Sequence, residues 1–575
     1  MVDSTDAVEL LKAVIGLKAG GEVREQQRVA VKEIDSCIKD NVNLLLEAPT
    51  GSGKTLSYLI PLAVNDSRAV VSTATKQLSE QALNVDVKFL NKALRELKTG
   101  KRVNAVLLKG RDNYLCLAKH ADMRALNNEA NTLFDIPDGS AVVGKAKRIA
   151  SEATSLSEWA EQTSTGDRSE APPVGDDTWR QYSSTNAECP GKAACPFGNE
   201  CFAEAAREAA REAQVVVTNH AIVALDLASE GMLLGDRDVF VFDELHELDN
   251  YLSSAWGAEL THKRLESVYK LVKGVPSLDE GLLKSLKQLT EEYDAALRSL
   301  PVGLIENDNS SVKMENFLTT LYNVTTKISL EASQMEKEAS SDAMKRLYSG
   351  VKKTVGELAD AAGILRDTSV ETIRWTSDTS TARRRKDWNV KKAQVVSETK
   401  ESTMVINAVP LRVGPKLQRH LTEREALMIG VSATVTVMGG FDIPLHNFGL
   451  EGKKNRTVVL DTPFDFSKQA MLYVPAPGTF PLPVGEDRVE HTAAVKRDSV
   501  DFLKAAGGAS LVLSTTAYGV GDLAEYYREE IPELEFLVQG EAPNAHLVDD
   551  FKKNRDKSLI GTMGFWHGLD APGEN

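Results

Sequence analysis

A glycine-rich loop and a carboxylate pair are the residues of this sequence best suited to nucleotide chemistry. The loop reads Ala-Pro-Thr-Gly-Ser-Gly-Lys-Thr at residues 48–55, and the pair is Asp243-Glu244. Backbone N–H groups of such a loop, and of the helix that follows it, point at phosphate oxygens. Lys54 would then reach the terminal phosphates, and Thr55 would bind Mg²⁺. We therefore predict a phosphate-binding site formed by Gly51, Ser52, Gly53, Lys54 and Thr55.

The carboxylate pair follows the apolar run Val239-Phe-Val-Phe, which is typical of a buried strand. Such a strand would deliver both carboxylates to the sheet edge beside the glycine-rich loop. One carboxylate would bind Mg²⁺ and the other would orient or deprotonate the attacking water. We predict that Lys54, Asp243 and Glu244 are catalytic, and that Thr55 and Asp243 are the Mg²⁺ ligands.

Four of the five cysteines lie between the loop and the carboxylate pair, at Cys116, Cys189, Cys195 and Cys201. Four thiolates suit either tetrahedral zinc or a [4Fe–4S] cluster. The short gaps, five residues each, are wider than the usual spacing of zinc ligands and favour iron–sulfur, although spacing alone leaves zinc open. The remaining cysteine, Cys37, lies in a helical stretch and is interpreted as a small apolar residue.

The composition indicates a globular protein of several domains. The 575 residues carry a net charge of −15, which argues against a general polyanion binder but not against local contacts with a nucleic-acid strand. No apolar run approaches the roughly 20 residues that span a bilayer, and the N-terminus lacks a signal-peptide pattern, so we expect a cytoplasmic protein. Five cysteines are too few for a disulfide framework in so long a chain.

Short apolar runs alternate with helical stretches along much of the chain, which predicts an α/β fold with a parallel, helix-covered sheet. The predicted strands are 42–47, 69–73, 104–108, 215–218, 239–242, 426–432 and 510–514. Two regions interrupt this alternation. Residues 139–187 are polar and predict an irregular insertion, whereas residues 256–400 predict a helical one.

The helical prediction for residues 256–400 rests on apolar side chains that recur at helical spacing. We interpret the two stripes as the core of a small helical bundle. Their members are Leu282, Leu283, Leu286, Leu289, Tyr293, Ala296, Leu297 and Leu300, then Met314, Phe317, Leu318, Leu321, Val324 and Ile328.

Several further segments, taken in order along nearly the whole chain, resemble the motifs of DinG/XPD-type iron–sulfur superfamily 2 helicases, and DinG most closely. Asp243-Glu-Leu-His246 is similar to the family's DEAH-type box, and Lys109 to Cys116 to the segment supplying its first cluster cysteine. The other similar segments are Arg24–Gln27 (adenine-sensing Q motif), 48–55 (motif I), 72–78 with Gln81 (motif Ia), 217–221 (the stretch after the cluster), 432–434 (motif III) and 561–573 (motif V).

The resemblance implies two RecA-like motor lobes, the second incomplete, with an iron–sulfur insertion and a helical arch. It also implies that the cofactors are ATP, Mg²⁺ and a [4Fe–4S] cluster bound by Cys116, Cys189, Cys195 and Cys201. The expected boundaries are 1–110, 206–255 and 401–440 for the first lobe, 111–205 for the cluster insertion, 256–400 for the arch, and 441–575 for the second lobe.

By the same resemblance, the protein would be an ATP-dependent DNA helicase of repair or replication that moves 5′ to 3′ on single-stranded DNA. A monomer would pass the strand through a hole between cluster insertion and arch, and would open forked or recombination-type duplexes. Arg24 and Gln27 would recognise adenine. The expected strand-contact and coupling residues are Thr75, Lys76, Ser432, Thr434, Gly568 and Asp570.

Two departures from the family pattern affect these expectations. His567 stands where many relatives have Glu. The sequence also ends after motif V, without the Gln-x-x-Gly-Arg-x-x-Arg stretch that carries the arginine finger. If these residues are the whole molecule, we expect ATP binding with feeble hydrolysis. The alternative function is then a hydrolysis-deficient nucleic-acid-binding subunit, or a part completed by a separate polypeptide.

A basic run inside the helical insertion has two interpretations. Arg383-Arg-Arg-Lys386, with Lys391 and Lys392 and the nearby Trp375 and Trp388, either lines the DNA path or forms a solvated loop.

Overall fold

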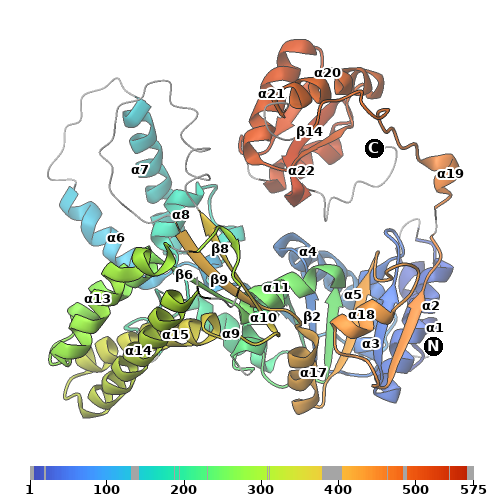
Figure 1. Cartoon of the computed structure of the whole chain (residues 1–575). Helices are drawn as coiled ribbons and strands as arrows, with labels where there is room; N and C mark the ends of the chain where they lie inside the picture. Colours follow the sequence, from blue (N-terminus) through green and yellow to red (C-terminus); the bar gives the residue numbers. More distant parts are fainter. Residues whose placement is uncertain are drawn as a thin grey trace. The chain divides into compact units, whose positions relative to one another are not determined.

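The computed structural model describes residues 5–18, 21–130, 141–186, 188–192, 195–229, 231–298, 300–306, 309, 311–378, 404–462, 464–483, 488–542 and 544–565. The chain forms two compact units, Met1–Asp461 and Thr462–Asn575 (Figure 1). In the described part of the chain, no helix is long and apolar enough to cross a membrane.

The first unit is built on a parallel sheet of seven strands in the order β11-β1-β10-β5-β2-β4-β3. This confirms the predicted α/β class and the strands expected in this unit. The strands are β1 (Asn43–Glu47), β2 (Ala69–Thr73), β3 (Ala105–Leu107), β4 (Val215–Asn219), β5 (Val239–Asp243), β10 (Leu427–Ser432) and β11 (Asn455–Val459). The unit extends to Asp461, beyond the boundary expected at residue 440, because the unpredicted strand β11 pairs with β1.

Helices cover both faces of this sheet, so its central strands are apolar throughout. Side chains alternate between faces along a strand. Accordingly, Leu44 and Leu46 lie in one core cluster, whereas Leu45 lies in the other. The first face is covered by α1 (Ala7–Gly16), α2 (Glu25–Asp40), α3 (Lys54–Val64) and α5 (Lys88–Glu96). The second is covered by α9 (Phe202–Glu212), α10 (His220–Ala228), α11 (Leu248–Trp256) and α17 (Gly414–Glu423).

The predicted helical insertion contains long helices and also a sheet. Its helices are α12 (His262–Lys273), α13 (Glu280–Leu297), α14 (Val312–Glu338) and α15 (Asp342–Leu365). The residues of both predicted apolar stripes lie in or against one shared core, which confirms their interpretation as core. The antiparallel sheet has the order β6-β9-β8-β7, from β6 (Ala258–Thr261), β7 (Gly303–Leu304), β8 (Thr372–Asp378) and β9 (Met404–Pro410).

This antiparallel sheet was not predicted, because its strands meet from distant parts of the sequence. Ala258 pairs with Ala408, which lies beyond the expected end of the insertion at residue 400. Trp375 lies on β8. The basic run at 383–386, Lys391, Lys392 and Trp388 lie outside the described residues.

The cysteine-containing insertion is more regular than its polar composition predicted. It includes α6 (Leu117–Ala130), α7 (Ala141–Ala160) and α8 (Asp176–Tyr182), so the prediction of an irregular region at 139–187 was wrong. Leu115, Leu156, Trp179 and Tyr182 are almost fully buried together. A few large apolar residues, spread thinly along the sequence, are therefore enough to order these helices.

The second unit is a smaller α/β body. Its parallel sheet has the order β12-β14-β13, from β12 (Leu511–Ser514), β13 (Glu535–Val538) and β14 (Lys557–Thr562), which confirms the strand predicted at 510–514. The core lies against α21 (Ala517–Glu530), with α20 (Arg488–Ala506) and α22 (Asn544–Lys553) also present. Short helix α19 (Phe466–Gln469) precedes them.

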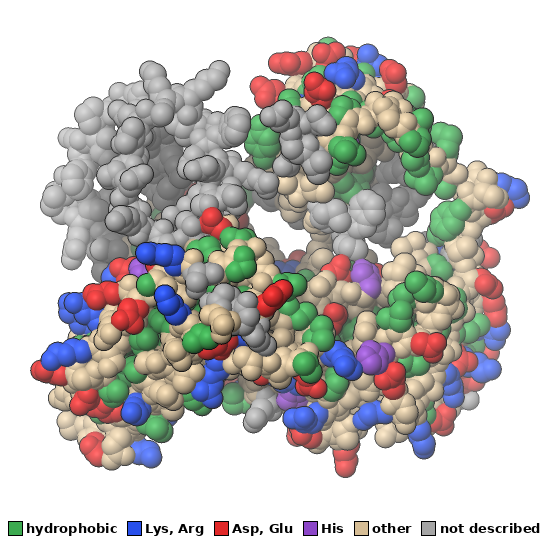
Figure 2. Space-filling model, viewed as in Figure 1, with side chains coloured by type: hydrophobic (Ala, Val, Ile, Leu, Met, Phe, Trp, Pro, Cys, Tyr) green, Lys and Arg blue, Asp and Glu red, His purple; other side chains and the backbone are tan. Residues whose placement is uncertain are grey.

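Charged side chains of both signs are interspersed over the face of the protein shown in Figure 2. This mixture agrees with the moderate net charge of −15. Among the described residues on this face, the two signs of charge are mixed and form no single uniformly basic surface.

Candidate active site

Three neighbouring strands bring the predicted nucleotide residues to one edge of the large sheet. Strand β10 lies between β1 and β5, with Glu47 opposite Ser432 and Val431 opposite Asp243. The glycine-rich loop follows β1, and Asp243 and Ser432 end β5 and β10. Because carboxyl ends of adjacent parallel strands share an edge, the loop, the carboxylate pair and Ser432 converge there.

The glycine-rich loop takes a backbone shape that requires glycine at two positions. Gly51 and Gly53 have φ of 78° and 75°, in the left-handed region, and α3 begins directly afterwards at Lys54. The Gln27 side chain donates from Nε2 to the Gly53 carbonyl at 3.2 Å. A Cβ atom on Gly53 would lie only 2.3 Å from that nitrogen. Gln27 therefore packs on the loop, and Arg24 precedes α2. Recognition of adenine by these two residues stays a prediction.

Lys54 and the carboxylate of Glu244 form an ion pair across this edge. Lys54 Nζ lies 2.7 Å from Glu244 Oε1, and both side chains are largely buried. Glu244 Oε2 accepts a hydrogen bond from the Ser432 hydroxyl at 3.2 Å, and His246 Nδ1 lies 2.7 Å from the same hydroxyl. Burial raises the pKa of Glu244, but Lys54, His246 and Ser432 outweigh it and leave the pKa lowered. Glu244 is thus ionised at neutral pH.

Asp243 has a different environment from Glu244. Burial raises the pKa of Asp243 to about 6, although Lys54 opposes this rise. The Tyr58 hydroxyl donates to Asp243 Oδ2 at 3.1 Å, and Tyr58 is fully buried. Tyr58 was not predicted as a site residue. Its position on the same helix face as Lys54 and Thr55, three to four residues on, is a signal that could have identified it.

The segment that follows Ser432 is fixed to the strand that precedes the glycine-rich loop. The Thr434 backbone N–H donates to Ser432 Oγ at 3.4 Å. Glu47 Oε2 accepts from the backbone N–H groups of Val435 and Thr436 at 2.8 and 2.6 Å. Glu47 was also missed by the sequence analysis. Its carboxylate links the segment after motif III to the strand that leads into the glycine-rich loop. From the sequence, Glu47 was predicted only as the last residue of a strand.

Both residues predicted to contact DNA in motif Ia lie at the start of α4 (Lys76–Gln81). Thr75 caps this helix, because its hydroxyl accepts from the Leu78 backbone N–H at 3.2 Å. Lys76 Nζ donates to Asn113 Oδ1 at 2.9 Å. Gly568 and Asp570, the motif V candidates, lie outside the described residues.

A buried histidine lies behind the nucleotide site. His220 Nδ1 lies 2.6 Å from the Ser72 hydroxyl, and the imidazole contacts the rings of Phe242 and Tyr251. Burial lowers the pKa of His220 to about 4, so the ring is neutral at physiological pH. The Tyr251 hydroxyl donates to the Ala74 carbonyl at 3.0 Å, which connects this cluster to the start of α4.

The four predicted metal-binding cysteines line one cavity of about 150 Å³. Burial raises the pKa of the Cys195 thiol, and the nearby Cys116, Cys189 and Cys201 raise it further. Within the described ranges, no group of three or more His, Cys, Asp or Glu side chains meets the geometry of a formed metal site. The cysteines therefore share a cavity of suitable donor chemistry, while their sulfur atoms do not adopt a ligand geometry.

The side chains of Arg111 and Lys353 contact the cysteine segment and its neighbours. Arg111 pairs with Glu204 at 2.5 Å, and both side chains are mostly buried. Lys353, on α15 of the helical insertion, donates to the backbone carbonyls of Asn186 and Cys189 at 2.6 and 3.1 Å. The helical and cysteine-containing insertions therefore touch beside one of the predicted ligands.

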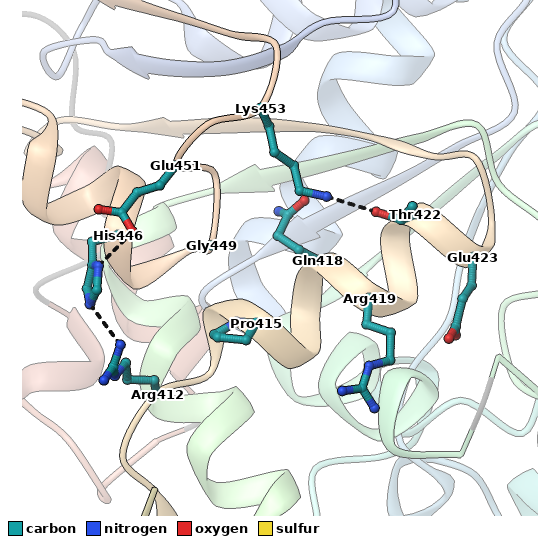
Figure 3. A pocket seen from close by; sticks show the side chains of 10 residues that line it. All are labelled: Arg412, Pro415, Gln418, Arg419, Thr422, Glu423, His446, Gly449, Glu451 and Lys453. Atoms are coloured by element: carbon teal, nitrogen blue, oxygen red, sulfur yellow. Dashed lines mark hydrogen bonds and ion pairs between the residues drawn. The ribbon is translucent and has the colours of Figure 1, made fainter.

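A separate surface pocket of about 460 Å³ lies between α17, α18 (Asp442–Asn447) and the segment after α18 (Figure 3). His446 Nδ1 lies 2.9 Å from Glu451, and Lys453 donates to the Thr422 hydroxyl at 3.1 Å. Its lining includes none of the residues predicted to bind nucleotide, metal or DNA.

The fold and this site define a P-loop nucleotide-binding motor of the helicase type. Residues 24–132 match the DEAD/DEAH box helicase family. The ATP-dependent helicase DinG of Mycobacterium tuberculosis is 30% identical over 594 aligned residues, covering 99% of this chain and 82% of that protein. The chain belongs to the DinG family of ATP-dependent helicases.

The chain is also similar to a second helicase and, more distantly, to a solved structure. The ATP-dependent DNA helicase YoaA of Escherichia coli is 29% identical over 578 residues, covering 98% of this chain and 82% of that protein. The solved structure of an XPD helicase is 12% identical with a TM-score of 0.44, covering 94% of this chain and 81% of that one.

Proposed function

We propose that this protein is an ATP-driven helicase that acts on DNA and translocates 5′ to 3′ on single-stranded DNA during repair or replication in the cytoplasm. The observation that carries the proposal is the convergence of the glycine-rich loop, the carboxylate pair and Ser432 on one sheet edge. The Lys54–Glu244 ion pair of 2.7 Å joins two of these three elements directly. Family membership supports ATP as the nucleotide that is hydrolysed, and the name of the similar YoaA protein supports DNA as the substrate.

The site residues would have different roles in phosphate cleavage. Lys54 and the loop N–H groups would bind the phosphates, while Thr55 and Asp243 would hold Mg²⁺. The metal supplies charge neutralisation at the terminal phosphates. Glu244, which is ionised at neutral pH, would accept a proton from the attacking water or orient it. Arg24 and Gln27 would recognise adenine, with Gln27 already packed on the loop.

Ser432 would couple the phosphates to the rest of the motor. Its hydroxyl contacts Glu244 and His246, and it also accepts from the Thr434 backbone. If Glu244 turned from Lys54 towards the attacking water, its hydrogen bond with Ser432 would change. The segment that contains Thr434, fixed through Glu47 to the glycine-rich loop, would register this change.

Cys116, Cys189, Cys195 and Cys201 would hold a [4Fe–4S] cluster. The donor set fits, because four thiols line one cavity and each can supply a thiolate ligand. The cluster would act as a structural crosslink of the insertion. Arg111 and Lys353 lie beside the cysteine segment and bring positive charge close to it.

Single-stranded DNA would pass between the cysteine-containing insertion and the helical insertion, the latter serving as the arch. Thr75 and Lys76 at the start of α4 are the proposed strand contacts on the motor lobe. Backbone contacts dominate such tracking, so binding should be indifferent to sequence and weaken with salt. Forked and recombination-type duplexes are the proposed substrates.

The test is phosphate release and strand separation by the purified chain with Mg²⁺ and ATP. Forked duplexes carrying a 5′ or a 3′ single-stranded tail are compared, with Lys54→Ala as the inactive control. If the helicase function holds for this chain by itself, DNA stimulates hydrolysis and the 5′-tailed fork opens. Opening of the 3′-tailed fork alone would reverse the assigned direction. Binding of DNA without any turnover would instead support the hydrolysis-deficient alternative.

A further inference from the structure

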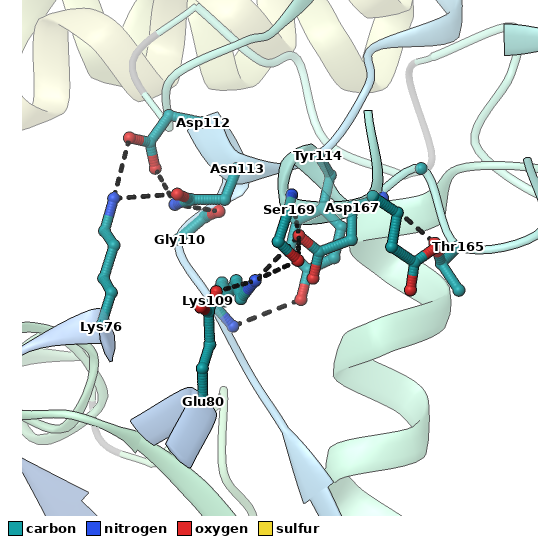
Figure 4. A network of polar contacts seen from close by, with 12 residues as sticks. Lys76, Glu80, Lys109, Gly110, Asp112, Asn113, Tyr114, Thr165, Asp167 and Ser169 are labelled. Atoms are coloured by element: carbon teal, nitrogen blue, oxygen red, sulfur yellow. Dashed lines mark hydrogen bonds and ion pairs between the residues drawn. The ribbon is translucent and has the colours of Figure 1, made fainter. Parts of the chain in front are cut away.

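The ammonium group of Lys109 is the centre of a buried polar network at the base of the cysteine-containing insertion (Figure 4). Lys109 Nζ lies 2.6 Å from Glu80 Oε1, 2.8 Å from Asp167 Oδ1 and 3.2 Å from the Ser169 hydroxyl. Only 6% of the Lys109 side chain is exposed. Three contacts to one buried ammonium group satisfy its three N–H donors.

These contacts join three separate parts of the chain. Glu80 lies on α4, the helix that starts with Thr75 and Lys76. Lys109 lies in the segment that leads from β3 to Cys116. Asp167 lies beyond α7 in the insertion, where it caps a short helical turn by accepting from the Ser169 backbone at 2.8 Å.

A second tie joins α4 to the same segment. Lys76 Nζ donates to Asn113 Oδ1 at 2.9 Å and lies 3.9 Å from Asp112. The Asp112 carbonyl accepts from the indole of buried Trp179 at 2.8 Å. Lys76 and Glu80, one helical turn apart, therefore both point from α4 to the cysteine-containing insertion (Figure 4).

The energetics of the network favour a positioning role. A buried ion pair contributes little net stability, since both ions lose their hydration, but removal of one partner leaves a costly unpaired charge. Glu80 is about one third exposed and Asp167 is 16% exposed. Replacement of Glu80 should therefore destabilise the fold less than replacement of Lys109.

We propose that Lys109 is a positioning residue that ties α4 to the cysteine-containing insertion, so that the two respond to the motor cycle as one body. The proposal rests on the proposed function in one respect: α4 is taken to contact the DNA strand. Rotation of α4 would then be transmitted to the insertion through the Glu80–Lys109–Asp167 bridge. Without the bridge, hydrolysis would continue while less of it was converted into strand separation.

The test removes the two carboxylate charges of the bridge one at a time in the full chain. Glu80→Gln removes the charge on the α4 side, and Asp167→Asn removes the charge on the insertion side. Glu96→Gln is the matched control, because Glu96 forms an exposed pair with Lys92 at 3.9 Å on neighbouring helix α5. Amide hydrogen exchange of residues 76–81 and 165–170 reports how often each of the two sides opens locally. The number of base pairs opened per ATP hydrolysed on a 5′-tailed fork measures the coupling between hydrolysis and strand separation.

With Glu80→Gln, we expect exchange in residues 76–81 to rise by roughly threefold or more, since contacting residues couple at this level. Exchange in 165–170 should change less than with Asp167→Asn, and base pairs opened per ATP should fall with both variants. The proposal is overturned if Glu80→Gln matches Glu96→Gln in exchange and in coupling. If the wild-type chain opens no fork, the proposed function fails, and the exchange comparison alone then decides the role of Lys109.

Discussion

Lys54 and Glu244 lie 190 positions apart in sequence, yet Lys54 Nζ and Glu244 Oε1 are separated by 2.7 Å. The pair joins the glycine-rich loop to the carboxylate pair, and Ser432 contacts the second oxygen of the same carboxylate. A phosphate that binds Lys54 competes with Glu244 for the same ammonium group. In the proposed mechanism, a phosphate bound to Lys54 would therefore release Glu244 towards the attacking water.

Replacing Glu244 with Gln should separate binding from turnover. The amide keeps the size of the side chain but cannot accept a proton from water, and it competes less well for Lys54 than the carboxylate did. We expect ATP affinity to be retained or improved, while kcat falls by about 100-fold or more. Fluorescent ATP binding and phosphate release measure the two effects. Loss of ATP affinity equal to the loss in rate would contradict the assignment.

Replacing Tyr58 with Phe should weaken the response to Mg²⁺. The variant removes the hydrogen bond to buried Asp243 at a stability cost of about 1–2 kcal/mol. We expect the Mg²⁺ concentration for half-maximal ATP hydrolysis to rise by about threefold or more. Tyr473→Phe is the control, because Tyr473 makes a long, exposed hydrogen bond to Asp498 at 3.4 Å. An unchanged Mg²⁺ requirement in Tyr58→Phe would argue against this role.

The cysteine cavity gives a prediction about metal content. Cys195→Ser should eliminate the broad visible absorbance of an iron–sulfur cluster after anaerobic purification, together with most of the bound iron. Cys37→Ser should leave both unchanged, since Cys37 is buried in the core beneath the sheet, away from the cavity. Iron and acid-labile sulfide are measured by chemical analysis. Stoichiometric zinc without iron in the wild-type chain would refute the cluster assignment.

The buried imidazole of His220 predicts loss of stability on acidification. Its pKa is about 4 in the fold against an ordinary 6.5, so the unfolded chain binds a proton first. The stabilisation is present above pH 6.5 and is lost as the pH falls towards 4, by about 2 kcal/mol between pH 7 and pH 5. Urea unfolding of the first unit at both pH values measures the loss. His220→Gln should reduce the change in the free energy of unfolding between pH 7 and pH 5. An unchanged pH dependence would exclude His220 as the cause of the loss in stability.

Much of the nucleotide site could be predicted from the sequence because its signals are local. Gly51 and Gly53 are required where the backbone turns left-handed, and the run Val239-Phe-Val-Phe is apolar because both faces of its strand are buried. Those constraints act within a few residues, so they appear as short motifs. The helical stripe from Leu282 to Leu300 is local in the same sense.

Other features depend on pairings that no short window contains. The antiparallel sheet joins Ala258 to Ala408, and β11 extends the first sheet past residue 440. Helices α7 and α8 form in a polar region, because a few apolar side chains meet in one cluster. The contacts of Glu47 and Lys109 are with partners distant in sequence, so they could not be predicted. Tyr58 also contacts a distant partner, and only its helical spacing from Lys54 is a local signal.

The sequence by itself determined the phosphate-binding loop and the carboxylate pair, because each consists of particular residue types a few positions apart. It also contained the four cysteines in order, but their spacing did not show that Cys116 lies near the other three. The tertiary structure decided which charges face each other. It placed Lys54 against Glu244, gathered four cysteines around one cavity, and connected Lys109 to two carboxylates on different segments. Electrostatic contacts depend on distances across the fold, and the physical reason for the division is that only the packed sheet and insertions set those distances.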